Sequence, residues 1–198
     1  MFEKLPAAVA SGVMAAAALT GAAPAAHSDE VASGVVLRDG SGDVWTGLSH
    51  DQEPTPADFP AADVTRAFVR HAPFAVRIRM RFVDLRRVGT QRYGVQIGTP
   101  SNVYFAQVVS APGARRGTHR FDSSQTSGCR GMTHRIRYVR NVVSMRIPRR
   151  CLERPRWVRV GLENTLTRNP GEHETIYRDN PHNHGAFSDE VTRRLYRG

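Results

Sequence analysis

The segment 74–85 constrains the fold of this chain more than any other. Four apolar residues alternate there with three arginines, in the order Val76, Arg77, Ile78, Arg79, Met80, Arg81 and Phe82. A period of two places one set on each face of a β-strand, whereas an α-helix would spread both sets around its axis. We therefore predict a strand with a buried apolar face and a solvent-facing arginine face.

Two hairpins follow from this alternation. Residues 63–71 alternate in the same way, and a turn at Ala72-Pro73 would pair Val69 with Val76. Residues 134–139 and 142–147 form a second hairpin around Arg140-Asn141, with Ile136 opposite Met145 and Arg135 opposite Arg146. In both hairpins the apolar residues then share one face, which supports the pairing.

The remaining sequence predicts an all-β protein. Short strand patterns recur between turn residues, at 35–37, 44–45, 93–97, 103–109, 118–122 and 157–162. About nine or ten short strands with little helix indicate a two-sheet antiparallel β-sandwich, jelly-roll-like, in which each hairpin presents one arginine face. The polar stretch 164–185 is expected to be a long loop, interrupted by a short strand at 175–177, within a single domain, 34–198.

The N-terminal sequence predicts export. Residues 5–19 are apolar and rich in alanine, and small residues follow at 22–26. This layout is typical of a signal peptide over residues 1–26, with 27–33 as a disordered lead-in. A membrane anchor is the alternative, but the apolar run is shorter than the roughly 20 residues that span a bilayer. We expect a secreted or cell-envelope protein with no transmembrane segment after cleavage.

Cys129 and Cys151 are the two cysteines of the chain. An isolated pair in an exported protein most often forms a disulfide. The loop that it would close corresponds to about 3 kcal/mol of stabilisation in the chain-entropy model.

The net charge of +10 favours anionic partners. The candidate binding residues lie on the first hairpin: Arg66, Phe68, Arg77, Arg79 and Arg81. Arginines 135, 137 and 146 form a second candidate face on the other hairpin. The alternative is a solvated sheet face that discourages aggregation. Nucleic acid is not expected, because the chain is exported and offers no platform of exposed aromatic residues for stacking bases.

Two groups of residues are candidate metal ligands. Asp39, Ser41 and Asp43 alternate in a glycine-containing loop, and Asp63 would complete a structural calcium site if the fold brings it near; an ordinary turn is the alternative. The second group comprises Glu172, His173, Glu174, Asp179, His182 and His184. Such residues bind transition metals, so the alternative function is a small metal-dependent hydrolase that uses the loop 172–184. No catalytic motif occurs, and no catalytic residue is assigned.

The front half of the chain resembles a known group of β-sandwiches. Asp39-Gly, Gly42-Asp-Val-Trp45, Ala62-Asp-Val-Thr65 and the hairpin that follows are similar to carbohydrate-binding family 9 and DOMON-like proteins over residues 35–105. The run 148–160 resembles small secreted bacterial proteins. The resemblance implies a jelly-roll-like sandwich that binds sugars, haem or envelope components, sometimes with structural calcium.

The expected function is therefore an exported, non-catalytic β-sandwich module that binds carbohydrate or anionic polymer. We expect a monomer, and cell-wall or acidic polysaccharide as its partner.

Overall fold

The computed structural model describes residues 33–47, 55–124, 127–169, 174–182 and 191–198. The predicted signal peptide and all but the last residue of the predicted lead-in lie outside the described residues. None of the helices in the described ranges is long and apolar enough to cross a membrane.

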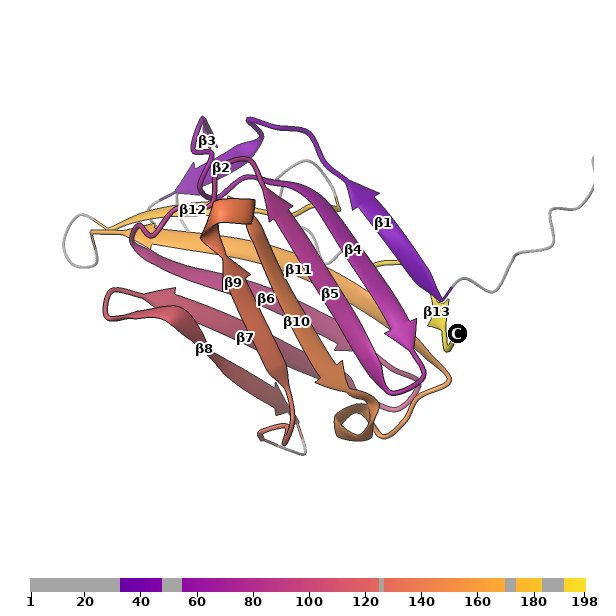
Figure 1. Ribbon diagram of the computed structural model, residues 1–198. Coiled ribbons are helices and arrows are strands. Elements are labelled where there is room, and N and C mark those ends of the chain that lie inside the picture. The colour runs from indigo at the N-terminus through magenta and orange to yellow at the C-terminus, as the bar shows by residue number, and fades with distance from the viewer. Residues whose placement is uncertain (1–32, 48–54, 125–126, 170–173, 183–190) are drawn as a thin grey trace, which may run out of the picture. The chain divides into compact units, whose positions relative to one another are not determined.

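Two antiparallel sheets pack face to face, as Figure 1 shows. The first has the order β1-β4-β5-β10-β9, formed by Gly34–Arg38, Val64–Ala72, Ala75–Phe82, Val142–Pro148 and Thr133–Arg137. The second has the order β3-β2-β12-β11-β6-β7-β8, formed by Thr55–Ala57, Val44–Gly47, Thr175–Asp179, Trp157–Arg168, Thr90–Gly98, Val103–Ala111 and Ala114–Ser123. The short strand β13 (Leu195–Tyr196) pairs with the beginning of β11. The predicted all-β two-sheet sandwich is confirmed.

The core lies between the sheets and is made by the inward residues of each strand. From β5 it takes the apolar residues that alternate with arginine: Val76, Ile78, Met80 and Phe82. The Phe82 ring meets the Tyr93 ring of β6 edge to face, with centroids 5.7 Å apart. The buried Tyr93 hydroxyl donates to Gln91 Oε1 at 2.8 Å, so this polar group is satisfied inside the core.

Both predicted hairpins form, but each register differs from the prediction by two residues. Val69 pairs with Ile78, rather than with Val76, because the chain turns at Pro73-Phe74. Ile136 pairs with Val143, rather than Met145. There the turn is longer than predicted, since a 3-10 turn (Tyr138–Arg140) and a left-handed Asn141 connect β9 to β10. A shift of two keeps every side chain on its predicted face.

The prediction of a loop over 164–185 is wrong for residues 164–168. Strand β11 continues through Arg168, and β12 pairs with it over Thr175–Asp179. Buried Leu166 and buried Asn164, whose Nδ2 donates to the Ala62 carbonyl at 2.8 Å, hold this extension in the sheet. The described residues contain thirteen strands, more than the nine or ten predicted, because pieces as short as β3 and β13 had no recognisable alternation.

Two further features hold the ends of the sandwich. Cys129 and Cys151 form the predicted disulfide, which ties the segment before β9 to the 3-10 turn (Arg149–Leu152) after β10. His71, at the end of β4, is fully buried, and its Nδ1–H donates to the Leu195 carbonyl at 2.9 Å. Burial lowers the pKa of His71, and the nearby guanidinium groups of Arg149 and Arg197 lower it further.

Candidate functional site

The outer face of the five-stranded sheet joins the arginines of the two hairpins. Strand β5 of the first hairpin pairs with β10 of the second, so that Arg77 lies opposite Arg146 and Arg79 lies opposite Ser144. The sequence predicted one arginine face per hairpin. The structure instead makes them a single surface, seen from outside in Figure 1 as the layer β1, β4, β5, β10 and β9.

Nine arginines project from this surface, which we call the arginine face. They are Arg38, Arg66, Arg70, Arg77, Arg79, Arg81, Arg135, Arg137 and Arg146. The pairing arranges them in rows that run across the strands. One row is Arg70, Arg77, Arg146 and Thr133; the next is Val36, Phe68, Arg79, Ser144 and Arg135; the third is Arg38, Arg66, Arg81, Val142 and Arg137.

No acidic residue neutralises this charge within the sheet. None of the five strands contains Asp or Glu. An ion pair joins Arg86 to Asp84, outside these strands. The arginine face is therefore a surface of uncompensated positive charge, and its guanidinium donors point to solvent.

A hollow of about 490 Å³ opens in the middle of the arginine face. Its outward-facing walls are formed by Phe68, Arg77, Arg79, Arg135 and Arg146. Ser144 lies at its centre, between Arg79 on β5 and Arg135 on β9. A serine among long arginines leaves space that a larger side chain would fill.

The five predicted binding residues divide into two groups. Phe68, Arg77 and Arg79 line the hollow, with Phe68 38% exposed at one end. Arg66 and Arg81 lie opposite each other in the third row and are not part of its lining. The central residue, Ser144, was missed, because its importance depends on the pairing of β5 with β10, which the sequence does not reveal.

The predicted calcium ligands come together at the other candidate site. Asp39 follows β1 and Asp43 precedes β2. One carboxylate oxygen from each of them and one from Asp179 lie within 4.8 Å of one another. Asp63 is adjacent, since its Oδ2 accepts a hydrogen bond from the Gly42 amide at 2.6 Å. Asp179 ends β12 and accepts a hydrogen bond from the Val64 amide through Oδ2.

The pKa values of the buried carboxyl groups follow from this crowding. Burial raises the pKa of Asp179 to about 8, and the carboxylates of Asp39, Asp43 and Asp63 add to the increase. Burial also raises the pKa of Asp63, with smaller contributions from Asp43 and Asp58.

The residues of the proposed hydrolase loop do not form one site among the described residues. Asp179 joins Asp39 and Asp43 instead of Glu174 or His182. Glu172, His173 and His184 lie outside the described residues. The sequence offers Asp179 as a candidate ligand together with residues of its own loop, whereas the pairing of β12 with β11 and β2 brings it to the turn after β1.

Comparison with known proteins identifies no relative of this chain. No family model matches the chain, and no curated protein or solved structure is significantly similar to it. The resemblance of residues 35–105 to carbohydrate-binding family 9 and DOMON-like proteins therefore stays a prediction, and the function has to be inferred from the geometry of the two sites.

Proposed function

We propose that this protein is an extracytoplasmic binding module that holds an acidic polysaccharide against the arginine face. The observation that carries the proposal is the hollow around Ser144, surrounded by arginines on a sheet face without a single acidic residue. Such a surface attracts polyanions over the Debye length and leaves its guanidinium groups available for direct contacts.

The chemistry of the lining favours carboxylate groups on a sugar polymer. Arginine offers a planar fork that binds a carboxylate through two parallel hydrogen bonds. Phe68, partly exposed beside Arg79, presents an aromatic ring on which the apolar face of a sugar ring can pack. A neutral carbohydrate would satisfy Phe68 and leave the arginines without partners, so a uronic-acid polymer fits this surface better.

The size of the face suits a polymer rather than a single sugar. Five strands spaced by about 4.8 Å extend roughly 19 Å from β1 to β9, which is enough for several sugar rings. Each row of arginines crosses these strands, and so a linear chain lying along a row meets positive charge repeatedly. We place this function outside the cytoplasm on the strength of the predicted signal peptide and of the disulfide Cys129–Cys151.

Calorimetric titration with polygalacturonate tests the proposal, with dextran as the neutral comparison. The protein is expected to bind the first polymer and not the second. The double variant Arg79→Gln/Arg146→Gln should weaken binding at least tenfold, because it removes two guanidinium groups beside Ser144.

The matched control is Arg120→Gln, an exposed arginine of β8 in the other sheet, which should bind as the unmodified protein does. If the control loses as much affinity for polygalacturonate as the double variant, the effect comes from net charge alone. That result would refute a site on the arginine face. Binding to duplex DNA without binding to polygalacturonate would contradict the choice of polymer.

A further inference from the structure

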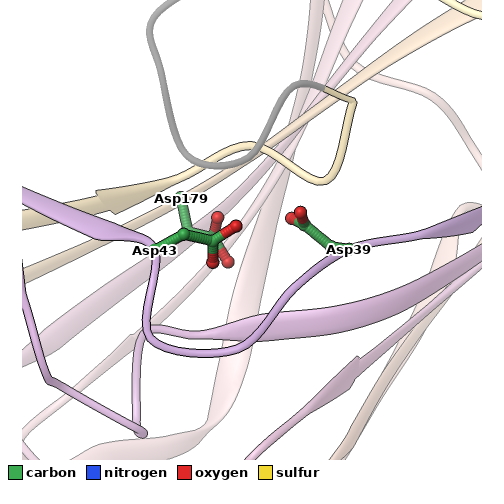
Figure 2. A group of neighbouring side chains, drawn as sticks. All are labelled: Asp39, Asp43 and Asp179. Atoms are coloured by element: carbon green, nitrogen blue, oxygen red, sulfur yellow. The ribbon is translucent and has the colours of Figure 1, made fainter.

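Four aspartates from separate parts of the chain meet at one edge of the sandwich. Asp39 and Asp43 flank the turn between β1 and β2, Asp63 precedes β4, and Asp179 ends β12. Figure 2 shows Asp39 approaching Asp43 and Asp179 from the opposite side, with the carboxylates turned toward one another. One oxygen from each of these three lies within 4.8 Å of the others, a separation that a single ion can bridge.

The backbone holds this arrangement in place. The Asp39 amide donates to the Thr65 carbonyl of β4 at 3.1 Å, and the Gly42 amide donates to Asp63 Oδ2 at 2.6 Å. Asp179 Oδ2 accepts from the Val64 amide. These hydrogen bonds connect the turn to β4 and β12. They occupy only some of the carboxylate oxygens of Asp63 and Asp179.

The second carboxylate oxygens of Asp63 and Asp179 are buried. Asp179 is 1% exposed and Asp63 is 2% exposed. The Oδ1 atoms of both residues are inaccessible to solvent and form no hydrogen bond. Asn164, the cross-strand neighbour of Asp179, also has a buried Oδ1 without a hydrogen bond. Buried carboxylates are normally paired or bound to metal, so these oxygens lack a partner that the fold would be expected to supply.

From this geometry we infer a calcium site formed by Asp39, Asp43 and Asp179, with Asp63 beside it. All the side-chain donors in the cluster are carboxylate oxygens, the hard ligands that Ca²⁺ prefers, and there is no imidazole or thiolate among them to favour zinc. Calcium accepts six to eight oxygens in irregular geometry, which suits ligands taken from a turn and two strand ends.

A bound ion would have a structural effect. It would join the turn after the edge strand β1 of one sheet to the end of β12 in the other sheet. An ion that binds only the folded chain stabilises it by mass action, so unfolding should depend on the calcium concentration. The site uses residues other than those of the arginine face, so the test of calcium binding and the test of polysaccharide binding can fail independently.

Calorimetry on the full chain, stripped of metal with EDTA, tests this inference by titration with CaCl₂. We expect one Ca²⁺ per chain, tighter binding of Ca²⁺ than of Mg²⁺, and a higher Tm in calcium than in EDTA. Asp43→Asn and Asp179→Asn should each weaken calcium binding at least tenfold and abolish the shift in Tm. Asp43→Asn should raise the Tm in EDTA, because it removes one of the crowded negative charges.

Asp122→Asn, an exposed aspartate of β8, is the control and should retain the calcium response. If Asp179→Asn fails to fold, the calcium affinities of Asp39→Asn and Asp43→Asn test the inference, since Asp39 and Asp43 lie in the turn and are less buried. The inference is overturned if the unmodified chain has the same Tm in calcium and EDTA, or if the three variants bind calcium as tightly as it does.

Discussion

Removing one arginine from the arginine face should stabilise the free protein. Arg77 lies directly opposite two other arginines, Arg70 on β4 and Arg146 on β10. Like charges facing each other across a sheet destabilise it by a few tenths to about 1 kcal/mol per pair, and solvent keeps exposed pairs near the lower value. Relief of two pairs in Arg77→Gln therefore raises the free energy of unfolding by roughly 0.5 kcal/mol.

Urea denaturation at two salt concentrations measures this effect. The stabilisation should be present at about 0.01 M salt, where the Debye length is about 30 Å, and vanish at about 1 M, where it is about 3 Å. Arg135→Gln is the matched control, because the residue directly opposite Arg135 is Ser144 rather than another arginine. A destabilised Arg77→Gln variant, or a gain that does not depend on salt, would refute the idea that these arginines repel one another in the free protein.

Two predictions concern the stability of the sandwich itself. The pKa of His71 is lowered from 6.5 by burial, so protonation of this group favours the unfolded chain, and below about pH 6.5 the unmodified protein should lose stability relative to His71→Asn as the pH falls. Urea denaturation from pH 7.5 to pH 5 checks this, and an unchanged slope in His71→Asn would show that other groups are responsible. Replacing Cys129 and Cys151 with serine should lower the free energy of unfolding by about 3 kcal/mol, because the open chain gains conformational entropy when it unfolds. Denaturation curves of the double variant test this, and a loss below about 1 kcal/mol would contradict that account.

The faces of the strands could be predicted from the sequence because their periodicity is local. The alternation in β5 assigns Ile78 to the core and Arg79 to solvent without any knowledge of the neighbouring strands. The registers were off by two residues because they depend on which residues make the turn, and several turns fit the same alternation. The extension of β11 was missed because Asn164 is polar in sequence yet buried in the fold through its bond to Ala62.

The candidate sites depend on contacts between distant segments, which a single sequence does not specify. The arginine face exists as one surface only because β5 pairs with β10. Asp179 reaches the turn after β1 only because β12 pairs with both β11 and β2. The types of residue were visible in the sequence for both sites, whereas their partners required the topology of the two sheets.

NMR can locate an acidic polysaccharide on the arginine face directly. Titrating ¹⁵N-labelled protein with a short galacturonic-acid oligomer reports which backbone amides change on binding. We predict that the largest shifts occur around Arg79, Ser144 and Arg135, on the three strands that surround the hollow. Shifts confined to β6, β7 and β8 in the other sheet, or no shifts at all, would contradict the claim.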